Sequence, residues 1–156
     1  VSTVGRLLDL RADPATPLRG ELGQQKLAAW SHPIPLDEVK RIGKRVGATV
    51  NDVLTAAVAG ALRAYIAGRG HDADGLTLRA VVPVNLRRAD DLHTLGNKFG
   101  MVFLPLPVGL AHPLARLREV KRAMDRLKRS PEAVVVFGLL QAFGKTTAAA
   151  LVAAVN

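Results

Sequence analysis

Cysteine is absent from the 156 residues of this chain, and aromatic side chains make up only 4% of it. The lack of cysteine excludes disulfide bonds and thiolate metal sites, and it favours a cytoplasmic setting. The scarcity of aromatic residues argues against single-stranded nucleic acid as a partner, because proteins that bind it stack the bases on aromatic side chains. Helix-turn-helix and zinc-finger spacings are also missing. We therefore expect no nucleic-acid partner.

Aliphatic residues and positive charge are what the chain has in abundance. Hydrophobic residues account for 49% of the sequence, which is enough for a folded core. Lys and Arg number 22 against 13 acidic residues, so the net charge is +9. Such an excess suits the phosphates of a nucleotide-like co-substrate or an acidic lipid surface, with a merely solvated basic face as the alternative.

Both ends of the sequence are unusual. The chain begins at Val1 without an initiator Met, and it ends at Asn156 inside an apolar run that has no stop signal. We therefore expect a fragment of a longer protein. Pro14 and Pro17 stand among small and polar residues, which predicts a linker or crossover segment over residues 1–20.

Apolar periodicity predicts two consecutive helices. The first runs over 35–47, with apolar residues on one face and basic residues elsewhere. The second runs over 49–67, and Gly68 and Gly70 end it. Its expected core stripe consists of Leu54, Val58, Ala61, Leu62 and Tyr65.

Strands and further helices follow. Residues 76–84 alternate before turning apolar, and residues 99–108 are apolar on both faces, as in a strand buried between layers. A long amphipathic helix is expected over 114–127, and Ser130 and Pro131 begin another. Residues 133–155 favour buried or interfacial helices over a membrane span. The order of elements indicates an α+β fold with helices packed on a sheet.

The start of the second helix contains one residue that local structure does not explain. Thr49 followed by Asp52 is a capping box, in which each side chain satisfies the other residue's backbone N–H. Asn51 lies between them, although it is only a middling helix former. The sequence therefore singles out Asn51 as a candidate functional residue.

Four segments together resemble a known family. Residues 36–54, Val82-Pro-Val-Asn-Leu-Arg87, Leu95-Gly-Asn-Lys-Phe-Gly100 and Leu104-Pro-Leu-Pro107 agree in order and spacing with the bacterial wax ester synthase/diacylglycerol acyltransferase family. The Asn-Asp pair of that family's motif corresponds to Asn51 and Asp52.

The resemblance implies a two-lobed fold similar to chloramphenicol acetyltransferase and condensation domains, with helices on a mixed sheet and the active site between the lobes. Residues 21–156 would then form an incomplete C-terminal lobe, and the chain would belong mainly to this second lobe. The implied reaction transfers a long-chain acyl group from acyl-CoA to diacylglycerol or a fatty alcohol, as in triacylglycerol and wax ester synthesis. Acyl-CoA would be a co-substrate, with no permanently bound cofactor and no metal.

The family's general base belongs to a His-His-x-x-x-Asp-Gly motif, which this chain lacks. The turn at His71 has two residues between His and Asp and follows the Asn-Asp pair, so it is not that motif. None of His32, His71, His93 and His112 has a neighbour at metal-ligand spacing. We therefore expect the base on the missing first lobe and expect the fragment alone to be inactive. The resemblance further implies that the whole enzyme lies in the cytoplasm, or peripherally at membranes or lipid inclusions.

The remaining roles implied for this chain are supporting ones. Asn51 and Asp52 would assist catalysis, and Asp52 would also hold the helix start. Substrate-binding roles are expected for Asn85, Arg87 and Asn97, which are polar residues beside strand ends. The alternative is a non-catalytic lobe that serves as a lipid-surface or protein-interaction module.

Overall fold

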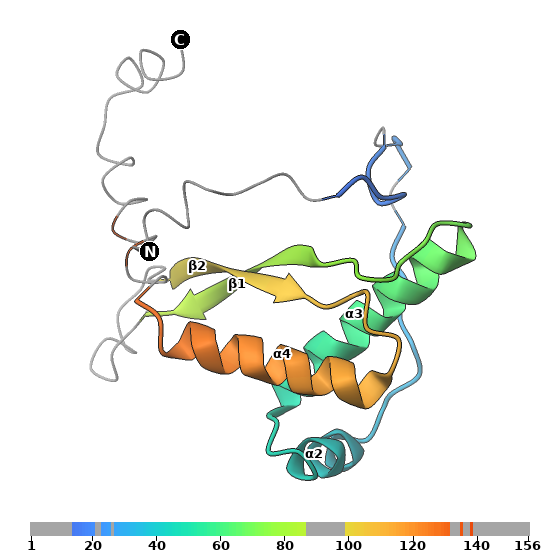
Figure 1. Ribbon diagram of the computed structural model, residues 1–156. Helices are drawn as coiled ribbons and strands as arrows, with labels where there is room; N and C mark the ends of the chain where they lie inside the picture. Colours follow the sequence, from blue (N-terminus) through green and yellow to red (C-terminus); the bar gives the residue numbers. More distant parts are fainter. Residues whose placement is uncertain are drawn as a thin grey trace, which may run out of the picture. The chain divides into compact units, whose positions relative to one another are not determined.

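The computed structural model describes residues 14–20, 23–25, 27–86, 99–131, 135 and 138 (Figure 1). These residues form three helices and a two-stranded antiparallel sheet. The elements in chain order are α2 (Leu36–Lys44), α3 (Val50–Gly68), β1 (Leu78–Asn85), β2 (Phe99–Leu106) and α4 (Pro113–Lys128). The α+β class is therefore confirmed for the described residues, whereas the two-lobed arrangement stays a prediction.

Two compact units make up the chain. One consists of residues 1–11, 80–104 and 126–156, and its described part holds most of the sheet. The other consists of residues 12–79 and 105–125, and it holds α2, α3 and most of α4. The candidate site and its surroundings all belong to this second unit, which is called the helical unit below.

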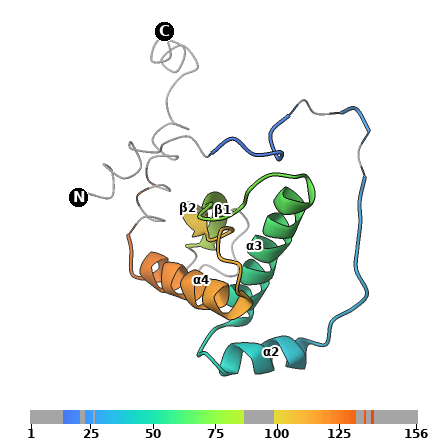
Figure 2. The same cartoon turned by 45° about the vertical axis from the view of Figure 1, so that its right-hand side comes forward.

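Helix α2 forms where the sequence predicts it. Asp37 and Glu38 occupy its first turn, where acidic side chains interact favourably with the helix dipole. Val39 and Gly43 are its buried residues. A Cβ at Gly43 would come within 2.5 Å of the Ala48 carbonyl oxygen, so glycine permits the close return of the chain into α3. Figure 2 shows α2 beneath the start of α3.

The core of the helical unit lies between α3 and α4. Ala56 of α3 and Leu117 and Val120 of α4 are buried together. The partly buried residues packed against them are Val46, Ala48, Val53 and Met124. The small side chain of Ala56 allows the two helices to approach closely, since interhelical distance depends on the side chains at the contact.

The predicted core stripe of α3 is wrong for this chain. Leu54, Val58 and Tyr65 are 50%, 53% and 41% exposed, whereas Ala56, Ala59 and Ile66 are buried. The periodicity of α3 is ambiguous because alanines and larger apolar residues occupy both sides of the helix. It is also the one helix among the described residues that is long and apolar enough to cross a membrane, a property that it shares with the core helices of soluble proteins.

Strand β2 also differs from its prediction. Its burial alternates, with Val102, Leu104 and Leu106 buried and Phe99 42% exposed. One face of β2 is therefore covered in this chain, and the expected burial on both faces is not observed. Alternating side chains point to opposite sides of a strand, so the uncovered positions belong to the second face.

Several predictions fall outside the described residues. These are most of the linker over 1–20 and nearly all of the apolar segment 133–155. At the start of the latter, the N–H of Val135 donates to the Pro131 carbonyl oxygen at 3.0 Å, which is a helical i to i−4 bond. It agrees with the helix start predicted at Ser130 and Pro131.

Candidate functional site

The candidate site is the turn from α2 into the first turn of α3. Gly47 has a φ of +64°, a left-handed conformation that glycine adopts without strain. The N–H of Ala48 then donates to the Gly43 carbonyl oxygen at 2.9 Å. This bond closes the turn and directs the chain into Thr49, the residue that caps α3.

The predicted capping box is confirmed. The N–H of Thr49 donates to Oδ2 of Asp52 at 2.8 Å, and the N–H of Asp52 donates to Oγ1 of Thr49 at 3.3 Å. Each residue thus satisfies a backbone donor that the helix start would otherwise leave unpaired. The structural role that the sequence assigns to Asp52 is borne out.

Asp52 is also unusually deep for a capping residue. Its exposed fraction is only 1%, and within the described part of the chain its Oδ1 is buried without a hydrogen-bond partner. Carboxylate oxygens are rarely buried without a partner, because the desolvation of the charge is then uncompensated. The carboxylate therefore retains an unused acceptor beside the N-terminus of α3.

Asn51 presents a different picture in the same turn. It is exposed, and the capping box beside it is complete without it. Its amide group thus stands at the positive end of a 19-residue helix, where donors favour a negatively charged group. This placement agrees with the sequence argument that Asn51 is not required for the cap.

A buried arginine holds α4 against α3, and the sequence reasoning missed it. Arg116 is 9% exposed, and its guanidinium donates to three carbonyl oxygens. Nε reaches Ala56 at 3.1 Å, while Nη1 reaches Leu110 at 2.6 Å and Ala111 at 3.4 Å. Gly60 makes room for it, since a Cβ there would lie 2.5 Å from Nη2 of Arg116. The available signals were a glycine inside a helix and an arginine between the apolar positions of α4.

A second arginine links two loops of the helical unit. Arg63 of α3 donates to the carbonyl oxygens of Val108 and Gly109 at 3.4 and 3.0 Å and pairs with Asp74. The N–H of Gly109 donates to the Leu76 carbonyl oxygen at 2.6 Å, in a contact so close that a Cβ at Gly109 would collide with the backbone of Gly75. Arg63 therefore fixes the segment before β1 to the loop after β2.

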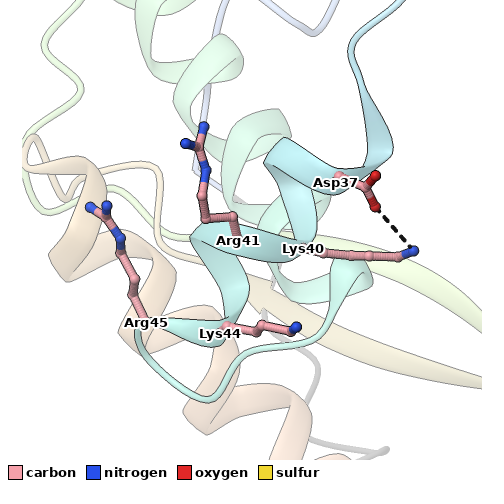
Figure 3. A pocket seen from close by; sticks show the side chains of 5 residues that line it. All are labelled: Asp37, Lys40, Arg41, Lys44 and Arg45. Atoms are coloured by element: carbon pink, nitrogen blue, oxygen red, sulfur yellow. Dashed lines mark hydrogen bonds and ion pairs between the residues drawn. The ribbon is translucent and has the colours of Figure 1, made fainter.

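The basic face of α2 lines an open hollow of about 500 Å³ (Figure 3). Four cations point from it, namely Lys40, Arg41, Lys44 and Arg45, and Lys40 pairs with Asp37 at 3.5 Å. The other three cations have no ion-pair partner among the described residues. This surface can attract a multiply charged anion, although all of its lining residues come from one helix and its C-cap.

A smaller and more apolar cavity of about 220 Å³ lies elsewhere in the helical unit. It is lined by Pro14, Thr16, Leu18, Arg19, Leu62, Leu78, Arg79 and Leu106. Leu62 belongs to α3, so the same helix carries Asn51 at its start and part of this cavity further along.

The other predicted site residues are placed only in part. Asn85 is the exposed last residue of β1. Arg87 and Asn97 lie outside the described residues, as does His93. Histidines 32, 71 and 112 are exposed, and among the described residues no group of three His, Cys, Asp or Glu side chains gathers as a metal site would require.

Comparison with known proteins shows which protein family this chain resembles. The model of the family described as the WS/DGAT C-terminal domain matches residues 95–156. A Mycobacterium tuberculosis H37Rv protein named as a diacylglycerol O-acyltransferase is 36% identical over 118 residues, which cover 72% of this chain and 23% of the relative. A Mycobacterium bovis protein of that name is 37% identical over 109 residues, covering 69% and 23%.

A further relative of that name, from Mycobacterium tuberculosis CDC 1551, is 34% identical over 129 residues, which cover 81% of this chain and 25% of the relative. The chain thus spans about a quarter of the length of these relatives. No solved structure matches it significantly. The family match and the similarity to these acyltransferases agree with the four motif segments, and the chain belongs to the wax ester synthase/diacylglycerol acyltransferase family.

Proposed function

We propose that this chain forms one wall of the acyl-transfer site in a longer acyl-CoA-dependent O-acyltransferase that makes triacylglycerol or wax esters. The observation that carries the proposal is the exposed side chain of Asn51 at the start of α3, which the completed capping box leaves available. The names of the relatives support the reaction class, since each is named for acyl transfer to diacylglycerol.

In this reaction the hydroxyl of the acceptor attacks the thioester carbon of acyl-CoA. A new C–O bond forms, the C–S bond breaks, and the hydroxyl proton passes through a base to the departing CoA thiolate. Negative charge develops on the thioester oxygen, where a positioned donor is most effective. Asn51 has the donor and the helix end for that role, while the base is supplied by a histidine outside this chain.

Substitution of Asn51 in the longer enzyme tests the proposal. Asn51→Ala should lower kcat roughly 100- to 1,000-fold, the loss observed when one such donor is removed. Its thermal stability should change little, because an exposed residue outside the cap contributes about 0.5 kcal/mol at most. Steady-state ester formation and a thermal unfolding scan measure the two effects.

Thr49→Ala is the matched control, since it weakens the same helix start without removing the amide. It should lower stability and leave kcat nearly unchanged. Equal losses of activity and stability in Asn51→Ala would reduce its role to helix formation and contradict the proposal. Rapid ester synthesis by residues 1–156 alone would contradict the assignment of the base to another segment.

The basic face of α2 supports a second candidate, a non-catalytic module that binds an anionic lipid surface. Each cation near such a surface contributes about 1 kcal/mol. Co-sedimentation with vesicles rich in phosphatidylserine should then fall when Arg41, Lys44 and Arg45 are changed to Gln, and it should weaken with salt. Unchanged sedimentation of that triple variant would remove the candidate.

A further inference from the structure

The cavity beside α3 has the chemistry of a site for a hydrocarbon tail. Leucine supplies half of its lining, through Leu18, Leu62, Leu78 and Leu106. Its volume of about 220 Å³ is below the roughly 300–1,000 Å³ of sites that enclose a whole small ligand. It therefore suits the apolar end of a ligand whose remainder lies elsewhere. Arg19 and Arg79 are compatible with such a tail, because arginine stems are themselves apolar.

An exposed apolar stripe on α3 leads from Asn51 to this cavity. Leu54 and Val58 follow Asn51 at intervals of three and four residues, and Leu62 follows Val58 after four more. Residues at this spacing share one face of a helix. Leu54 and Val58 are 50% and 53% exposed, whereas Leu62 is partly buried in the cavity lining. The stripe thus begins at a polar amide and ends at a leucine-lined hollow.

The length of the stripe fits a long acyl chain. Leu62 lies eleven positions after Asn51, so at a rise of about 1.5 Å per residue the path measures about 17 Å. A bilayer core of about 30 Å holds two layers of acyl tails, so one long tail spans about 15 Å. A thioester near Asn51 would therefore place its methyl end at the cavity.

We propose that the acyl tail of the donor lies along this α3 stripe and that its methyl end occupies the leucine-lined cavity. The inference rests on the proposed function for the direction of the tail, with the thioester at Asn51. The cavity then acts as a ruler for acyl length, since tails too short to reach it lose its apolar contacts. Another wall of the path comes from polypeptide outside this chain.

A photolabelling experiment on residues 1–156 tests the site itself. The probe is palmitoyl-CoA that carries a diazirine near its methyl end. The cross-links should map to peptides that contain Leu18, Leu62, Leu78 or Leu106, and unlabelled palmitoyl-CoA should compete with them. The substitution Leu62→Trp fills the cavity and should reduce this labelling at least tenfold.

Ala64→Trp is the matched control, because two residues further along a helix is roughly the opposite side, and Ala64 is exposed there. It should label like the unchanged chain. Leu18→Trp, at a half-exposed position outside the helices, repeats the test in case Leu62→Trp unfolds α3. Labelling spread along the chain, or labelling insensitive to both cavity substitutions, would overturn the proposal.

The longer enzyme separates this inference from the proposed function. There, Leu62→Trp should lower the ratio of palmitoyl to decanoyl transfer at least tenfold while Ala64→Trp leaves that ratio unchanged. Active transfer with an unaltered ratio overturns the tail site and leaves the proposed function standing. Cavity labelling without any ester transfer overturns the proposed function alone.

Discussion

Gly60→Ala in α3 should destabilise the chain, although the same change normally stabilises a helix. An alanine inside a helix is favoured over glycine by about 1 kcal/mol. At this position, however, the new Cβ would lie 2.5 Å from Nη2 and 3.0 Å from Cζ of Arg116. The guanidinium must move, and it cannot do so freely because it is buried and holds three carbonyl oxygens.

The magnitude follows from these bonds. A hydrogen bond from a charged donor contributes about 1.5–3 kcal/mol, and displacement of the guanidinium weakens at least one of the three. Set against the helix gain, the net loss of stability is about 0.5–2 kcal/mol. In a domain of this size that loss lowers Tm by roughly 1–8 °C. Urea unfolding followed by circular dichroism and a thermal scan measure it.

A double-mutant cycle that combines Gly60→Ala with Arg116→Met tests whether Arg116 causes this loss of stability. In an Arg116→Met background nothing blocks the new Cβ, so Gly60→Ala should there raise stability by about 1 kcal/mol. The sign of the effect should thus reverse with the identity of residue 116. If Gly60→Ala stabilises both backgrounds equally, Arg116 does not occupy the space above Gly60 and the account of the α3–α4 contact is wrong.

Two further predictions concern the other polar contacts of the helical unit. Thr49→Ala should cost about 1 kcal/mol of stability. The double variant Thr49→Ala with Asp52→Ala should cost less than the sum of the single changes, because the two residues cap each other. Urea titrations of the three variants measure these losses, and strict additivity would contradict a shared capping box. Arg63→Lys should lower the stability of the chain by about 1 kcal/mol and speed hydrogen exchange at the Gly109 amide, because one ammonium cannot reach both carbonyl oxygens and Asp74. Asp74→Asn is the milder control, since the Asp74 carboxylate is largely exposed. Equal exchange rates at Gly109 in the two variants would refute the linking role of Arg63.

The local features of this protein could be predicted from its sequence. The start of α3 at Thr49 and the capping box with Asp52 depend on residues three positions apart, and both are confirmed. The start of α2 follows equally from its first-turn acids, although the helix ends at Lys44, three residues before the predicted end at Gly47. The family motifs likewise depend on order and spacing along the chain.

The buried face of α3 was decided by tertiary structure. Leu54 and Val58 form the more obvious apolar stripe, yet Ala56 faces α4, because a helix rich in alanine offers several faces and close packing favours the slimmest. Arg116 became visible only through its three carbonyl partners, which come from segments 5 to 60 residues away in sequence. Sequence spacing reports what lies within a turn or a strand; which faces meet depends on the volume and polarity of elements brought together from distant parts of the chain.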